Sequence, residues 1–172
     1  GIQIAGEALD IIAAEAAGSL RDSQSLLDQV AAYAGGEVTA ELANEALGLV
    51  DSAVLFDFTA ALRTADADAA LQVVAGVSRA GRDLGQFVRQ LCEHLKRLLF
   101  ARSLADKFAD EGLGAELLDR YRSTSQSWDE NDLLRLLMMA VETGHRVHRE
   151  MPQPRMELEL FTMRAAHLDR AI

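Results

Sequence analysis

The chain has 172 residues, of which 49% are hydrophobic and 26% are charged, so it is long enough to form a sizeable domain with its own core. A net charge of -10 excludes nonspecific DNA binding through the whole surface, and a single cysteine excludes an internal disulfide framework. No apolar run approaches the roughly 20 residues of a membrane-spanning helix, so we expect no membrane partner. Abundant alanine and leucine, with only two prolines, favour helices.

The first part of the chain predicts two helices followed by a break. Apolar residues at helical spacing predict one helix over residues 8–17 and a second over residues 20–34, packed together as a hairpin. Ser19 is the expected N-cap of the second helix. The pair Gly35-Gly36 ends that helix, and Thr39 is expected to cap the next one. We therefore place the domain boundary at the glycine pair.

The rest of the chain predicts a bundle of about six helices. The capping-box pair Ser127 and Glu130 is expected to begin a long helix that Pro152 ends. Residues 107–114 and 123–125 are expected to be connections. The predicted helical ranges are 39–47, 52–64, 66–80, 83–104, 115–122, 127–150 and 155 onward.

The last predicted helix is apolar on two opposite sides. Met156, Leu160 and Met163 share one side, whereas Leu158 and Phe161 lie on nearly the opposite side. One side would pack in the core of its own domain, and the other could contact a second subunit or lie between internal helices. The candidate interface residues are Met156, Leu158, Leu160, Phe161 and Leu168.

The stretch Gly18-Ser19-Leu20-Arg21-Asp22, followed by Ser25-Leu26-Leu27-Asp28-Gln29, places an arginine in the first turn of a helix. Unpaired N–H groups and a partial positive charge at a helix N-terminus favour an anion nearby. Two interpretations follow from the chemistry alone. Arg21 pairs locally with Asp22, or its guanidinium binds the phosphate oxygens of a ligand.

Together with Ala8-Leu9-Asp10-Ile11-Ile12-Ala13, this stretch resembles the lid region of the gamma/tau subunit of bacterial DNA polymerase III, the AAA-type ATPase of the sliding-clamp loader. Two later stretches resemble the collar domain of the same family. They are Val38-Thr39 with Leu47-Gly48-Leu49-Val50-Asp51, and Pro154-Arg155-Met156-Glu157-Leu158-Glu159-Leu160. The resemblance thus spans essentially the whole chain.

The resemblance implies an all-α fold, with a two-helix remnant of an ATPase lid over residues 1–36 and a helical collar, or oligomerisation, domain over residues 37–172. It also implies that Arg21 is the sensor 2 residue, which reaches the ATP phosphates in the full-length protein. The sequence has no Gly-x-x-x-x-Gly-Lys-Ser/Thr loop. The zinc-binding cysteines of the family are also absent, since Cys92 is the single cysteine of the sequence. We therefore expect a fragment without the ATPase core and without activity, cofactor or metal of its own, because ATP and magnesium belong to the full-length ATPase.

The function implied by the resemblance is assembly of the clamp-loader pentamer, which loads the sliding clamp for DNA replication at the expense of ATP. The expected partners are gamma/tau copies, delta and delta-prime through the collar, with the sliding clamp and primed DNA reached only through the full assembly. The expected location is the bacterial cytoplasm, at the replisome. The alternative function is an acidic helical protein-interaction adaptor unrelated to replication.

Two polar clusters receive no assigned site. Glu142, His145 and His148 include the Glu-x-x-His spacing of di-iron bundles, but the sequence has no second copy of that motif, so no metal site is predicted. The helix predicted over residues 83–104 has a basic side that could contact DNA or an acidic neighbour, or could simply be solvated. That side consists of Arg89, Lys96, Arg97 and Arg102.

Overall fold

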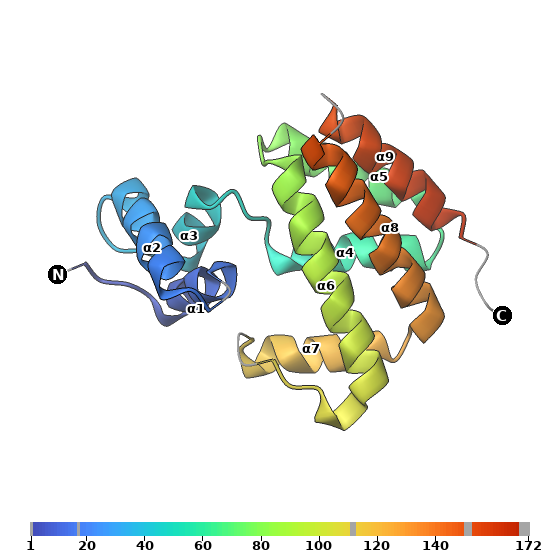
Figure 1. Cartoon of the computed structure of the whole chain (residues 1–172), viewed down its shortest axis with the longest axis horizontal. Coiled ribbons are helices and arrows are strands. Elements are labelled where there is room, and N and C mark those ends of the chain that lie inside the picture. The colour runs from blue at the N-terminus through green and yellow to red at the C-terminus, as the bar shows by residue number, and fades with distance from the viewer. Residues whose placement is uncertain (1, 17, 111–112, 150–152, 169–172) are drawn as a thin grey trace. The chain divides into compact units, whose positions relative to one another are not determined.

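The structure is a computed structural model, and it describes residues 2–16, 18–110, 113–149 and 153–168. Within these residues helices dominate, which confirms the predicted all-α fold (Figure 1). None of the described helices is both long enough and apolar enough to cross a membrane. The helices are α1 (Gly6–Glu15), α2 (Leu20–Ala34), α3 (Ala40–Ala46), α4 (Ser52–Arg63), α5 (Ala67–Arg79), α6 (Leu84–Leu104), α7 (Ala115–Ser125), α8 (Glu130–Arg149) and α9 (Pro154–Ala166), and a short 3-10 turn, η1, spans Ala105–Lys107.

The helices pack as two units. Helices α1 to α3 belong to the first unit, which comprises the described residues of 1–49 and 110–114. Helices α4 to α9 belong to the second unit, which comprises the described residues of 50–109 and 115–172. The sequence predicts a domain boundary at Gly35-Gly36, so we expect the helix after Thr39 to belong to the collar domain. In the structure that helix, α3, packs against α1 and α2, so the two compact units divide after α3.

Side chains from all three helices explain why α3 packs in the first unit. Its Ala43 is fully buried in a cluster that also contains Ile12 and Val30. The Gln29 side chain on α2 donates a hydrogen bond to the carbonyl of Ala46 at 2.9 Å, which ties the C-terminal end of α3 to α2. The segment before α3 is held as well, because the amide of Val38 donates to the carbonyl of Gln3 at 2.9 Å. The first unit is therefore a three-helix structure.

The predicted ends of α2 are confirmed. The Ser19 hydroxyl accepts a hydrogen bond from the amide of Asp22 at 3.3 Å, which satisfies one of the free N–H groups of the first turn. At the other end Gly35 adopts a φ of 62°, a left-handed conformation that glycine takes without steric cost and that stops a helix.

In the second unit aspartates cap three successive helices. Asp51, Asp66 and Asp83 accept hydrogen bonds from amides in the first turns of α4, α5 and α6, at 2.7, 2.9 and 2.7 Å. Each carboxylate also places a negative charge at the positive end of its helix. The Gln90 amide pairs with both backbone groups of Val50, at 3.0 and 3.1 Å, and so attaches the beginning of this unit to α6.

Two local predictions in the second unit are wrong. The cap of α8 is Asp129, whose carboxylate accepts from the amides of Asn131 and Asp132 at 2.8 and 3.3 Å. Ser127 instead donates its hydroxyl proton to the carbonyl of Thr124 at 2.8 Å. Residues 123–125, expected to be a linker, form the last turn of α7.

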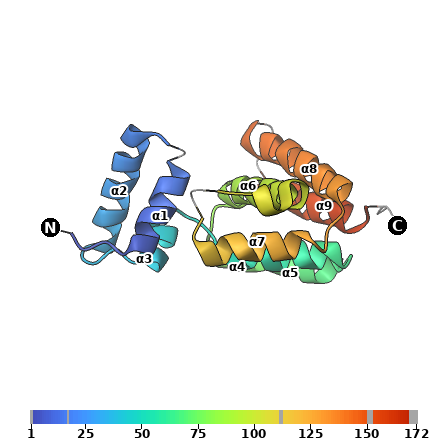
Figure 2. The same ribbon diagram turned by 90° about the horizontal axis from the view of Figure 1, so that it is seen from below.

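The second unit has two layers of helices around one core. Helices α6, α8 and α9 lie over helices α4, α5 and α7 (Figures 1 and 2). Aromatic rings join the layers, since Phe58 of α4 meets Phe87 of α6 edge-on, with ring centroids 5.6 Å apart, and stacks with Phe161 of α9 at 6.3 Å. The largest fully buried aliphatic side chains of this core are Leu62, Leu91, Leu95, Leu98, Leu133 and Leu158.

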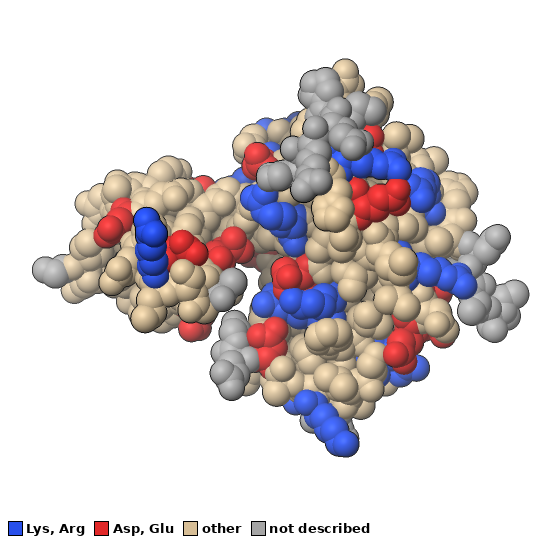
Figure 3. All heavy atoms as spheres, in the orientation of Figure 1, with Lys and Arg blue, Asp and Glu red and all other residues tan. Residues whose placement is uncertain are grey.

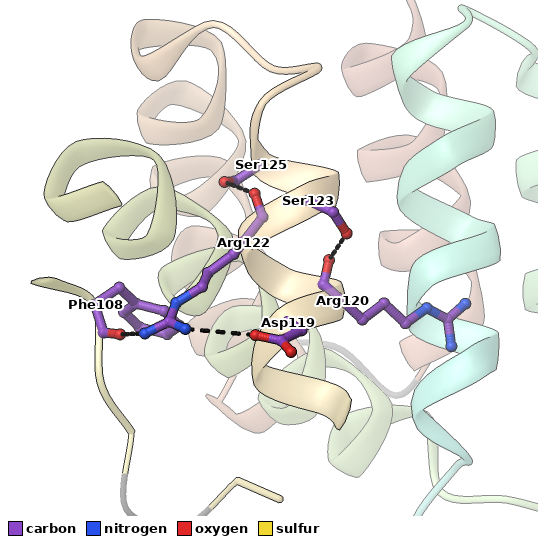
Figure 4. A network of polar contacts seen from close by, with 6 residues as sticks. All are labelled: Phe108, Asp119, Arg120, Arg122, Ser123 and Ser125. Atoms are coloured by element: carbon purple, nitrogen blue, oxygen red, sulfur yellow. Dashed lines mark hydrogen bonds and ion pairs between the residues drawn. The ribbon is translucent and has the colours of Figure 1, made fainter. Parts of the chain in front are cut away.

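Helix α7 is held in place by a pair of arginines (Figure 4). The Arg122 guanidinium donates to the carbonyl of Phe108 at 2.8 Å and lies 3.4 Å from the Asp119 carboxylate. Arg120 extends toward α4, where its guanidinium carbon lies 4.0 Å from the centre of the Phe56 ring. Both arginines therefore fix α7 against segments that come earlier in the chain.

Candidate functional site

Arg21 lies in the first turn of α2 with its side chain exposed. Its carbonyl accepts a hydrogen bond from the Ser25 hydroxyl at 3.1 Å. Within the described part of the chain, its guanidinium has no hydrogen-bond or ion-pair partner, and the local pairing with Asp22 considered from the sequence does not form. The guanidinium is therefore available to an anion from outside this chain.

The charge of the first unit makes Arg21 unusual. Residues 1–49 contain eight acidic residues, and Arg21 is their single lysine or arginine. A positive charge at a helix N-terminus opposes the helix dipole, so Arg21 does not stabilise α2 through that interaction. The helix dipole therefore gives no reason for an arginine at this position.

The two apolar sides predicted for the last helix are present in α9. Leu158 and Phe161 point into the core, with 0% and 2% of their surfaces exposed. Met156, Leu160 and Met163 lie on the outside, and Leu160 is 51% exposed. Because Leu158 and Phe161 are buried within their own unit, these two interface candidates are not available to a partner.

The remaining interface candidate, Leu168, is not part of the outer stripe. Leu168 is partly buried, beyond the C-terminal end of α9. The exposed stripe of α9 therefore consists of Met156, Leu160 and Met163.

Helices α8 and α6 extend this exposed surface. Leu134, Met138 and Val141 lie at helical spacing on the side of α8 opposite its buried residues, and Phe100 and Leu104 are exposed on α6. Among the described residues of the second unit, every exposed large hydrophobic side chain lies on these three helices. We call this surface the outer apolar face; it consists of Phe100, Leu104, Leu134, Met138, Val141, Met156, Leu160 and Met163.

Ion pairs join α8 to α9 beside these stripes. Arg146 of α8 lies 2.5 Å from Glu142 on the same helix and 3.8 Å from the nearly buried carboxylate of Glu157 on α9. Arg164 of α9 lies 3.9 Å from Glu142. Figure 3 shows charged side chains of both signs interspersed over the visible surface of this layer. Since the ion pairs connect the two helices, they keep the exposed stripes of α8 and α9 in fixed register.

Three of the four basic residues of the cluster predicted on α6 have polar partners within the chain. Lys96 pairs with Glu93, and Arg89 donates to the side chain of Gln86. The Arg102 guanidinium donates a hydrogen bond to the side-chain oxygen of Gln126 at 3.3 Å. Arg89, Lys96 and Arg102 are therefore each paired with a polar side chain of their own chain.

Sequence reasoning overlooked His94, which is fully buried in α6. One ring nitrogen lies 3.1 Å from the Thr59 hydroxyl of α4, and the other lies 2.8 Å from the Tyr121 hydroxyl of α7. Burial, together with the positive charges of Arg97 and Arg120, lowers the pKa of His94 to about 3. A neutral histidine with both nitrogens occupied and no access to solvent links helices and does not transfer protons to a substrate.

The described residues hold no group of three or more histidine, cysteine, aspartate or glutamate side chains placed to bind a metal. Glu142 is instead paired with Arg146 and Arg164, and the side chain of His148 lies outside the described residues.

The fold and these features define an all-α protein in which a small helical unit with one unpaired arginine precedes a larger helical module with one apolar face. Two family models match the chain, and they meet at residues 36–38, where the sequence predicts the domain boundary, and not after α3. Residues 38–171 match the family model described as "DNA polymerase III subunits gamma and tau domain III", and residues 1–36 match "DNA polymerase III clamp loader subunit, ATPase lid domain". The chain belongs to the gamma and tau subunits of DNA polymerase III, so the predicted family is confirmed.

Curated relatives support this assignment. The chain is 26% identical to "DNA polymerase III subunit tau/gamma" of Haemophilus influenzae over 92% of its own length and 22% of the relative. It is 31% identical to "DNA polymerase III subunit gamma/tau" of Mycobacterium tuberculosis over 86% of its own length and 26% of the relative. "Protein STICHEL-like 1" of Arabidopsis thaliana is 29% identical over 78% of the chain and 11% of the relative. The chain thus spans about a quarter of the length of the bacterial relatives, and the adaptor unrelated to replication is not favoured.

The exposed stripe of α8 could have been found from the sequence. Leu134, Met138 and Val141 follow an i, i+4, i+7 spacing, while Leu133, Leu136 and Ala140 define the opposite, buried side. A helix that is apolar on two sides requires two covering surfaces, as on α9.

Proposed function

We propose that the second unit is the assembly module of a clamp-loader subunit and that its outer apolar face binds a helical domain of another clamp-loader subunit. The observation that carries this proposal is the gathering of all described exposed large hydrophobic side chains of the unit on α6, α8 and α9. Exposed large hydrophobic side chains gathered on three neighbouring helices are typical of protein contacts. Curated relatives are themselves named as subunits of DNA polymerase III.

The partners in this proposal are further gamma/tau copies, delta and delta-prime. The sliding clamp and primed DNA are reached through the full assembly, which acts at the replisome in the cytoplasm. In that assembly the module keeps the ATPase domains of neighbouring subunits in register while they load the clamp.

The energetics require a partner that covers the whole face. Completing the burial of a half-exposed leucine or methionine contributes about 1 kcal/mol, and eight such side chains contribute about 8 kcal/mol. Association costs about 4 to 15 kcal/mol in lost translational and rotational freedom. A contact with the α9 stripe alone is therefore too small, whereas a contact across α6, α8 and α9 can offset the cost.

Leu160→Glu tests this proposal in the full-length subunit. Leu160 is half exposed, so the charge should not unfold α9, but it must be desolvated when a partner covers the face. We expect association with the other clamp-loader subunits, followed by sedimentation velocity, to weaken by about tenfold or more. Gln72→Glu, at an exposed position on α5 in the other layer, is the matched control and should assemble normally. Equal assembly of both variants would refute the proposed interface.

We also propose that Arg21 contacts nucleotide phosphate in the full-length subunit, where the ATPase core holds ATP and magnesium. Its exposed, unpaired guanidinium and its place in the first turn of α2 support this role. Nothing in this chain supplies a phosphate-binding loop, so Arg21 would act on a nucleotide bound elsewhere in the subunit.

Substitution of Arg21 in the full-length subunit tests this second proposal. Arg21→Ala should weaken ATP-dependent clamp loading by the equivalent of about 1.5 to 3 kcal/mol, the usual contribution of a hydrogen bond to a charged group. Arg21→Lys keeps the charge but loses the guanidinium fork, so it should have an intermediate effect. Subunit assembly should stay intact in both variants. Unchanged loading by Arg21→Ala would remove the proposed role.

A further inference from the structure

Methionine is concentrated on the outer apolar face. The chain has five methionines, and Met138, Met156 and Met163 have 65%, 38% and 42% of their surfaces exposed there. Met139, the neighbour of Met138 on α8, is only partly exposed. The three exposed thioethers come from two adjacent helices and lie among exposed leucine and valine side chains.

Flexible methionine side chains adapt to irregular apolar surfaces, but they are also open to oxidation. The sulfur lone pair attacks one oxygen of hydrogen peroxide, the O–O bond breaks, and water leaves with the second oxygen. The sulfur is oxidised by two electrons to a sulfoxide and the peroxide is reduced. The product carries a polar S–O group in place of an apolar thioether.

Cys92 does not compete effectively for the oxidant. It is partly buried, and burial, with a smaller contribution from the charge of Glu93, raises the pKa of its thiol to about 11. Little thiolate is present at neutral pH, and the thiolate is the form that peroxide oxidises. Among the described residues of this chain, peroxide chemistry is therefore directed to the exposed methionines of the face.

We propose that the outer apolar face is an oxidation-sensitive contact, in which peroxide converts Met138, Met156 and Met163 of the unassembled chain to sulfoxides that weaken its assembly with other clamp-loader subunits. This inference rests on the proposed function of the same face. A sulfoxide oxygen buried in an apolar contact loses its hydrogen bonds to water without replacement. Enzymatic reduction of the sulfoxides restores the apolar surface.

The test compares the full-length subunit before and after hydrogen peroxide. Peptide mass spectrometry follows the addition of one oxygen at each methionine, and sedimentation velocity follows assembly with gamma/tau, delta and delta-prime. Part of the oxidised sample is then treated with methionine sulfoxide reductases. We expect the three face methionines to be oxidised before Met139, assembly to weaken by about tenfold, and reductase treatment to reverse the loss.

Two variants locate the effect, each compared with its own untreated sample. In Met138→Leu/Met156→Leu/Met163→Leu the face has no thioether, and peroxide should leave assembly unchanged. In Met139→Leu/Met151→Leu the face methionines remain, and peroxide should still weaken assembly.

The inference is overturned if the three sulfoxides form and assembly is unchanged, or if the triple leucine variant loses assembly as strongly as the natural sequence. It is also overturned if Met139 is oxidised as fast as Met138, because oxidation is then not selective for the face. Failure of the untreated subunit to assemble, or normal assembly of Leu160→Glu, would refute the proposed interface itself. The failure of the interface and the failure of its oxidation sensitivity are therefore distinguishable.

Discussion

His94 is excluded from solvent, and yet both of its ring nitrogens have partners. The Thr59 hydroxyl lies 3.0 Å from the carbonyl of Leu55 and donates its proton there, so it accepts a proton from the histidine. The other ring nitrogen then accepts from the Tyr121 hydroxyl. This arrangement joins α4, α6 and α7 through one neutral side chain, and Phe56 packs edge-on against the ring at 4.6 Å.

Tyr121→Phe should destabilise the second unit by about 1 to 3 kcal/mol, because it leaves a buried ring nitrogen without a partner. Urea unfolding followed by circular dichroism measures the effect. Tyr33→Phe is the matched control, since the Tyr33 hydroxyl is exposed and its bond to Glu45 is at the surface, so this change should cost less than about 0.5 kcal/mol. Equal losses would show that the buried contact has no special contribution.

His94 also predicts a pH dependence of stability. Its pKa falls from 6.5 to about 3 on folding, chiefly because burial penalises the charged ring. Between these values the unfolded chain binds a proton that the folded chain does not, so the free energy of unfolding decreases as the pH falls. The contribution of His94 to that decrease is about 2 kcal/mol between pH 7 and pH 5.

Urea unfolding at pH 7 and pH 5 measures this contribution by comparison with His94→Gln, which does not titrate in this range. The natural sequence should lose about 2 kcal/mol more than the variant between the two pH values. An identical loss in both would show that His94 is not held neutral in the folded state.

At the scale of helices, caps were the most predictable feature. The side chains of Ser19, Thr39 and Asp66 each cap the helix expected from the sequence, because each is a capping residue just before an apolar periodic segment. The N-cap of α8 was harder to predict, since Ser127 and Asp129 are both suitable capping residues and local spacing does not choose between them. The buried side chain of Ser125 belongs to the last turn of α7, and that turn depends on tertiary packing which the sequence pattern does not contain.

Asp129→Ala should destabilise the second unit by about 1 kcal/mol, because two amides of the first turn of α8 lose their acceptor. Ser127→Ala, which removes an exposed hydroxyl that does not cap α8, should cost less than about 0.5 kcal/mol. Thermal unfolding of the two variants measures the difference. A larger loss for Ser127→Ala would mean that the serine is the effective cap.

At the scale of the whole molecule, sequence patterns predicted where the helices lie along the chain better than which helices pack together. The apolar stripe of α3 is short, and only packing shows that Ala43 completes the core of the first unit. The spacing of Met156, Leu160 and Met163 predicted one apolar side of α9 and placed Leu158 and Phe161 on the other, but spacing could not tell which of the two sides faces the core. Only the tertiary structure shows that the three helices with exposed apolar side chains, α6, α8 and α9, are neighbours.

In the proposed assembly, other clamp-loader subunits cover the outer apolar face. Photo-cross-linking in the assembled complex tests it most directly, with a photoreactive amino acid placed in turn at Phe100, Met138 and Leu160, one on each helix of the face. We expect a cross-link to another subunit from all three positions. Assembly of the complex without a cross-link from any of them would contradict it.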